Sequence, residues 1–144
     1  MFDIKQEIDQ LRKIINTAQD PIFYELDFIV ADESSVYFEL TKNISFFNFM
    51  HFNNLDDISF TVSNNLADHI WRDLTLSELK FKDYFNIINS IFQKVNNFSA
   101  IESWYLFSPY NEDFSDYFPS VTGEGFLFKL KNDQYCFFVI MGMD

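Results

Sequence analysis

Apolar residues near the start of the chain recur at helical spacing. Their stripe, with intervals of three or four residues, consists of Ile4, Ile8, Leu11 and Ile15. This spacing places the apolar side chains on one face of a helix, which we expect over about residues 3–17. Pro21 blocks its continuation, because proline lacks a backbone N–H and clashes with the preceding turn.

Helical spacing returns in the middle of the chain. We expect a short helix from about residue 65, and a longer one from about residue 77 that ends at the polar pair 96–97. The apolar faces are Leu66, Ile70 and Leu74 in the short helix and Phe81, Tyr84, Phe85, Ile88, Ile91, Phe92 and Val95 in the long one.

Runs rich in β-branched and aromatic residues predict strands in the remaining segments. The expected strands are residues 22–30, 36–41, 44–52, 58–62, 101–107, 125–130 and 134–141. In the second of them apolar and polar residues alternate, which predicts one buried and one solvated face. Turn-prone residues at 31–35 and 131–133 connect neighbouring strands as hairpins.

Together these elements predict an α+β fold. We expect a mainly antiparallel β-sheet with helices packed on one face, the N-terminal helix among them. A chain of 144 residues that is 48% hydrophobic is large enough to bury a core without disulfides. No repeat, linker or low-complexity segment divides it, so residues 1–144 are expected to form a single domain.

The distribution of charge adds information about partners. The formal net charge is -12, and two blocks account for it. Residues 14–71 hold nine acidic residues against one basic residue, Lys42, and residues 95–128 hold five acidic residues and no basic one. Such an excess of acid favours association with basic surfaces, and it is an argument about partners rather than about fold.

The second acidic block contains a segment, residues 110–118, in which three carboxylates alternate with four aromatic residues. Acidic groups steer an encounter with a basic protein and buried rings stabilise the complex, so this segment is typical of a docking loop. A second interpretation stays open: Tyr110, Phe114 and Phe118 are spaced by four residues and can turn into the core, which leaves only the carboxylates outside.

We therefore expect an interface with a protein partner. The candidate contact residues are Tyr110, Glu112, Asp113, Phe114, Asp116 and Tyr117, with Asp32, Glu33, Asp56 and Asp57 as a second acidic patch. If the acidic residues instead scatter over all faces of the fold, a structural or adaptor domain is favoured, in which acidity serves solubility.

No motif identifies a reaction, and we expect a protein that is not an enzyme and has no cofactor. The single cysteine, Cys136, lies in an apolar run and is expected to be a buried small hydrophobe. His51 is expected to be half-buried in a strand. The glycine pair 123 and 125 lacks the setting of a phosphate loop and is expected to form a turn before a strand.

The third hypothesis is a small metal-dependent enzyme. Asp68, His69 and Asp73 can share one helix face as ligands. The spacing matches no established metal motif, so a solvated helix face explains these residues better and we expect no metal.

Direct binding to nucleic acid or membrane is not expected. Phosphate binding requires a basic face, and the only net-positive block, residues 72–94, carries a single excess charge. No apolar run approaches the roughly 20 residues of a transmembrane helix, and the N-terminus has no signal-peptide pattern. We expect a soluble cytoplasmic protein, consistent with one unpaired cysteine.

In its size, strong acidity, single cysteine and lack of catalytic motifs, the chain resembles bacterial immunity proteins. These are the cytoplasmic antitoxins of contact-dependent growth inhibition and other polymorphic toxin systems and of nuclease bacteriocins. The resemblance implies a tight complex with a cognate toxin domain, often a basic nuclease, whose active site or substrate-binding surface is blocked. It matches no signature motif, so it transfers no residue role to this chain.

Overall fold

The computed structural model describes residues 2–15, 23–42, 45, 47–70, 74–120 and 122–143. Within these, only the backbone is considered for residues 23, 24, 67–70, 74–83 and 143. The described chain forms one antiparallel sheet of five strands in the order β1-β5-β4-β3-β2. The strands are β1 (Phe23–Ala31), β2 (Asn48–Met50), β3 (Ile101–Phe107), β4 (Thr122–Leu130) and β5 (Tyr135–Met143).

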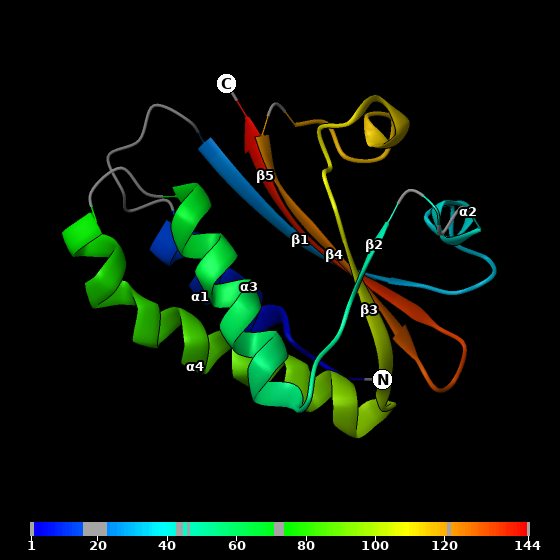
Figure 1. The fold of residues 1–144 in the computed structure, drawn as a ribbon, viewed down its shortest axis with the longest axis horizontal. Coiled ribbons are helices and arrows are strands. Elements are labelled where there is room, and N and C mark those ends of the chain that lie inside the picture. Colours follow the sequence, from blue (N-terminus) through cyan, green and yellow to red (C-terminus); the bar gives the residue numbers. More distant parts are fainter. Residues whose placement is uncertain are drawn as a thin grey trace.

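Helices cover both faces of this sheet (Figure 1). The helices are α1 (Lys5–Ile15), α2 (Phe38–Thr41), α3 (Leu55–Ile70) and α4 (Leu74–Phe98), and a short 3-10 helix, η2 (Glu112–Phe114), follows β3. The three long helices α1, α3 and α4 lie on one face, and the short α2 and η2 lie on the other (Figure 1). The predicted α+β fold with an antiparallel sheet is confirmed, and the second covered face is an addition to it.

Each face of the sheet has its own core because side chains alternate along the strands. On the face covered by α1, α3 and α4, Trp104 lies parallel to the rings of Phe126 and Phe128, each 6.0 Å away between ring centroids. On the opposite side, Phe107 and Phe137 meet edge to face at 6.0 Å. Strands buried on both faces read as continuous apolar runs, which is the pattern of residues 135–141.

The strongest elements were predicted well. Strand β3 spans the expected residues 101–107, and β1, β4 and β5 each lie within a few residues of the prediction. Helix α1 buries the expected Ile8, Leu11 and Ile15. Helix α4 buries the second half of its expected stripe, through Tyr84, Ile88, Ile91, Phe92 and Val95. The turn at 131–133 closes the β4–β5 hairpin with Asp133 at a positive φ of 65°.

Two predicted strands are wrong. Residues 36–41 form a turn and the short helix α2, because β1 pairs with the distant β5 rather than with the next segment. Residues 58–62 lie inside α3, where Ile58, Val62 and Leu66 are buried four residues apart. Among the described residues of the predicted strand 44–52, only 48–50 form a strand, β2, and His51 just beyond it is exposed rather than half-buried.

The glycine pair also differs from its prediction, because both residues lie within β4 and not in a turn. Gly123 has a φ of 135°, and a Cβ there would lie 1.9 Å from the carbonyl oxygen of Ile140. At Gly125 a Cβ would lie 2.4 Å from Cζ of Phe107, so the ring occupies the space that a side chain would take. These two positions require glycine for different reasons, one a backbone conformation and one a packing contact.

One edge of the sheet is held by a side chain of α1. The Arg12 guanidinium donates from Nη2 and Nε to the carbonyl oxygen of Leu26 in the edge strand β1, at 2.8 and 3.1 Å. It also forms ion pairs with Glu25 at 2.8 Å and Asp27 at 3.2 Å. Burial and the neighbouring Glu25 raise the pKa of Asp27, and Arg12 acts in the opposite direction. This contact satisfies a backbone acceptor that an edge strand otherwise exposes.

Cys136 is buried as predicted, and burial raises the pKa of its thiol to about 12. Because the thiolate is the reactive form, we expect no labelling of the folded protein by a thiol reagent at neutral pH. In denaturant the same reagent should label the single thiol of each chain, which is the control. Mass spectrometry measures the labelling, and rapid labelling of the native protein would contradict this placement of β5.

None of the helices in the described part of the chain is long and apolar enough to cross a membrane.

Candidate functional site

The candidate docking segment, residues 110–118, forms a compact turn that we call the acidic turn. It joins β3 to β4 at one end of the sheet and contains η2. The Asn111 side chain begins η2 by accepting a hydrogen bond from the Asp113 N–H at 3.1 Å. The Phe118 N–H then donates to the Phe114 carbonyl at 2.9 Å. The chain thus makes a helical turn here, as the spacing of the aromatic residues allows.

The rings of the acidic turn divide between core and solvent. Phe114 is 2% exposed and its ring lies 4.8 Å from Phe107 and 5.4 Å from Phe47. Phe118 is also buried and stacks on Tyr37 at 5.5 Å. Phe114 was expected to contact a partner; in this fold its ring is buried and anchors the turn to the sheet.

The other two rings remain at the surface. Tyr110 is 50% exposed, and Tyr117 is half-buried with its ring 6.0 Å from Tyr37. The interpretation in which all three rings at four-residue spacing enter the core therefore holds for two of them and not for Tyr110.

The carboxylates of the acidic turn are exposed, as both interpretations predicted. Glu112, Asp113 and Asp116 form no ion pair with any residue that the structure describes. Two of them directly precede Phe114, whose buried ring fixes the position of the backbone that carries them. The result is a set of three unneutralised charges on an anchored turn.

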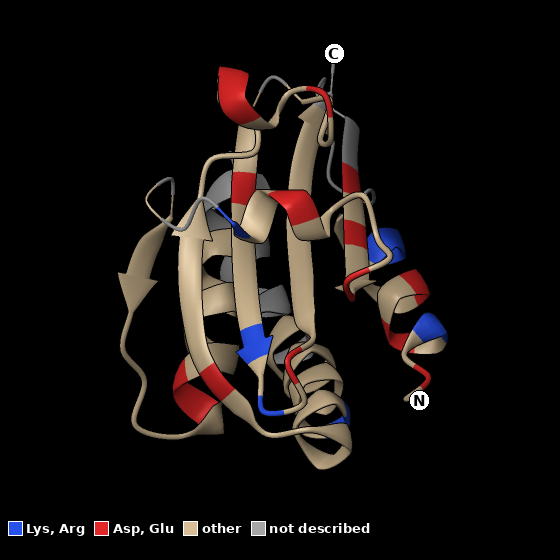
Figure 2. Ribbon diagram, turned by 90° about the vertical axis from the view of Figure 1, so that its right-hand side faces the viewer, with Lys and Arg blue, Asp and Glu red and all other residues tan. Residues whose placement is uncertain are grey.

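The second predicted patch lies elsewhere. Strands β1 and β2 run parallel to each other in this sheet, so the residues that follow them lie at the end opposite the acidic turn. Asp32 and Glu33 follow β1, and Asp56 and Asp57 begin α3 after β2. In Figure 2 the acidic positions accordingly appear at both ends of the sheet. The four residues do not extend the acidic turn into one surface.

Two of those four carboxylates have local structural roles. Asp32 accepts hydrogen bonds from the Ser34 hydroxyl at 2.6 Å and from its N–H at 3.0 Å, and these bonds lower the pKa of Asp32. Asp57 accepts from the Asn53 N–H at 2.9 Å and donates its own N–H to the Asn54 side chain at 3.1 Å. Asp57 and Asn54 thus cap α3 in the manner of a capping box. Glu33 and Asp56 are exposed.

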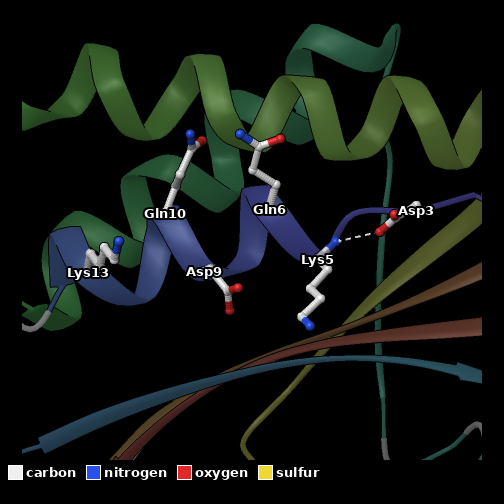
Figure 3. A pocket seen from close by; sticks show the side chains of 6 residues that line it. All are labelled: Asp3, Lys5, Gln6, Asp9, Gln10 and Lys13. Carbon is white, nitrogen blue, oxygen red and sulfur yellow. Dashed lines mark hydrogen bonds between the residues drawn. The ribbon is translucent and has the colours of Figure 1, made fainter.

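The hollows described here are open to solvent. A hollow of about 450 Å³ lies along α1, lined by Asp3, Lys5, Gln6, Asp9, Gln10 and Lys13. In Figure 3 Gln6 and Gln10 project to one side of α1, and Lys5 and Asp9 project to the other. The one hydrogen bond drawn among them, from the Lys5 N–H to the Asp3 carboxylate at 3.1 Å, is a local contact at the start of the helix.

The described residues contain no group of three His, Cys, Asp or Glu side chains that could hold a metal ion. The metal hypothesis falls on Asp68, His69 and Asp73, whose side chains lie outside the described residues.

The sequence prediction missed an exposed aromatic ring on the edge strand β2. Phe49 is 62% exposed, and its ring lies 5.5 Å from that of Tyr105 on β3. Because residues 44–52 were predicted to form one apolar strand, the sequence did not distinguish Phe49 from the buried Phe47. The polar residues Asn48 and His51 on either side of it are the signal that marks this short strand as an edge.

Fold and surface together define a small α+β domain with exposed acidic side chains at both ends of its sheet. Comparison of the chain with protein-family models, with curated proteins and with solved structures finds no match.

Proposed function

We propose that this chain is an immunity protein that neutralises a cognate toxin or nuclease domain by stoichiometric binding. The observation that carries the proposal is the acidic turn. Three carboxylates, free of basic neighbours over residues 95–128, stand on a backbone that Phe114 and Phe118 fix to the sheet. Such preorganised charges lower the cost of ordering an interface. The bacterial cytoplasm is the compartment that this function requires.

The mechanism that follows is inhibition without catalysis. A nuclease presents a basic surface to the phosphates of its substrate, and carboxylates on the acidic turn compete for that surface. The charges accelerate the encounter and select the partner, whereas short-range contacts determine how slowly the complex dissociates. The formal charge of -12 acts in the same direction over longer distances.

The test is rescue of growth. If a neighbouring gene encodes a toxin domain, that domain is expressed in a bacterial host with and without this chain, and cells that express the toxin are expected to grow only when this chain is also expressed. In parallel, stopped-flow association of the two purified proteins should slow steeply from low to moderate salt. Absence of rescue, or an association rate that ignores salt, would overturn the proposal.

A pair of charge variants makes the test specific. In the first, Glu112→Gln, Asp113→Asn and Asp116→Asn remove three charges from the acidic turn. In the matched control, Glu33→Gln, Asp56→Asn and Asp133→Asn remove three exposed charges from the opposite end of the sheet. We expect the first to slow association about tenfold and the control to have a much smaller effect. Equal effects would mean that only net charge matters.

A second candidate function is a structural or adaptor domain, and one observation favours it. The acidic residues lie at both ends of the sheet (Figure 2), and Glu25 and Asp27, between those ends, form ion pairs with Arg12. In that case, acidity serves solubility and no single surface binds the partner. The matched control above distinguishes the two functions.

A further inference from the structure

One part of the sheet remains uncovered on the face that carries α2 and the acidic turn. These two elements pack over Phe137 and its neighbours in β5 and β4, where Phe118 and Tyr37 both contact Phe137. They stop short of β2. Phe49 is 62% exposed there, and Tyr105 beside it is only half-buried. No strand of the described chain pairs with the outer side of β2.

A row of rings connects this uncovered edge to the acidic turn. Phe49 lies 5.5 Å from Tyr105, and Tyr105 lies 6.4 Å from Phe47. Phe47 in turn lies 5.4 Å from Phe114, which directly follows Glu112 and Asp113. The exposed ring of Phe49 is therefore connected by ring contacts to the turn that carries the carboxylates.

The segments that carry these residues contain no base of their own. Strand β2 pairs with β3, and neither residues 43–71 nor residues 95–128 contain a lysine or an arginine. Lys42, just before the first segment, pairs with Glu39 at 2.9 Å. Lys129 lies on the neighbouring strand β4, opposite Ser103, and is 3.9 Å from Glu102. The exposed ring of Phe49 and the carboxylates of the acidic turn thus belong to segments without a positive charge.

We propose that Phe49, Tyr105, Glu112 and Asp113 form a docking surface, the edge surface, for a basic segment of a protein partner. The partner's lysine or arginine heads meet the two carboxylates, and its apolar side chains or alkyl stems cover the ring of Phe49. The inference rests on the proposed function, since it names the contact through which a basic toxin domain is held. In this inference, burial of the Phe49 ring supplies the short-range stabilisation of the complex, which the net charge of the chain does not provide.

The chain supplies a matched comparison for Phe49. Phe60 is similarly exposed, at 52%, but it belongs to α3 in the helix layer on the other face of the sheet. Asp56 lies one helical turn before it, so Phe60 also has an acidic neighbour. Serine at either position removes one exposed ring from the surface without emptying the core.

The experiment uses a short peptide of alternating lysine and valine as the probe, titrated into the ¹⁵N-labelled full chain. We expect the largest amide shift changes in residues 48–50, 103–107 and 111–116. Phe49→Ser should weaken peptide binding about tenfold, Phe49→Tyr should restore most of it, and Phe60→Ser should leave it unchanged. Thermal unfolding of each variant verifies that the fold is kept.

Shift changes centred on Asp32 and Glu33, or equal effects of the two serine variants, would overturn the edge surface. This outcome is independent of the growth assay. A chain that binds the peptide at this edge and fails to rescue growth refutes the immunity function alone. Rescue that persists undiminished in Phe49→Ser, with peptide shifts elsewhere, refutes the edge surface alone.

Discussion

Phe114→Ala is expected to lower the free energy of unfolding by about 3–5 kcal/mol, the range for truncating a buried phenylalanine. The ring is 2% exposed and contacts both Phe47 and Phe107, so its removal leaves a cavity under the acidic turn. Denaturant unfolding followed by circular dichroism measures the change. A loss of this size in a domain of ordinary stability leaves a substantial unfolded fraction on mild warming.

Tyr110→Ala is the matched control for this variant. Tyr110 belongs to the same segment and is 50% exposed, and its truncation should change stability by no more than about 0.5 kcal/mol. If the two variants had equal and small effects, the Phe114 ring would be free in solution. The acidic turn would then be the aromatic docking loop that its composition first indicates.

Gly125→Ala is the second large expected effect, with a loss of about 1–3 kcal/mol in the free energy of unfolding. A Cβ at this position would lie 2.4 Å from Cζ of Phe107, and the ring is buried, so the strand or the ring has to move. If the contact with the ring is the cause, Phe107→Leu relieves it. In the Phe107→Leu background, the additional loss caused by Gly125→Ala should fall below about 1 kcal/mol.

Gly123→Ala separates a packing contact from a backbone requirement. Its Cβ would lie 1.9 Å from the Ile140 carbonyl oxygen, and its φ of 135° is one that residues with a side chain rarely adopt. We expect a loss of at least about 3 kcal/mol, unchanged by Phe107→Leu. Rescue of Gly123→Ala by Phe107→Leu, measured in the same unfolding series, would contradict this account of β4.

The sequence predicted secondary structure well in segments with long runs of buried apolar residues. Strands β3, β4 and β5 read correctly because long apolar runs leave little choice of conformation. The prediction failed at residues 36–41 and 58–62, which are short and rich in β-branched and aromatic residues. Those windows hold too few residues to separate a strand from a helical turn. The order of the strands, with β1 beside β5, depends on contacts more than a hundred residues apart.

The candidate site was predicted in part. Carboxylates at Glu112, Asp113 and Asp116 were expected at the surface and lie there, because charge alone makes burial unfavourable. Which rings turn inward depends on Phe47 and Phe107, which no local pattern connects to the segment. The roles of Asp32 and Asp57 had readable signals, an acid two residues before serine and a capping box, and these were overlooked.

The contact between Arg12 and the Leu26 carbonyl has a consequence for assembly. An added strand that pairs along β1 would need the Leu26 carbonyl as an acceptor, and the Arg12 guanidinium already occupies it. The same guanidinium places a charged group at this margin of the sheet, which is one of the ways in which edge strands resist pairing with other chains.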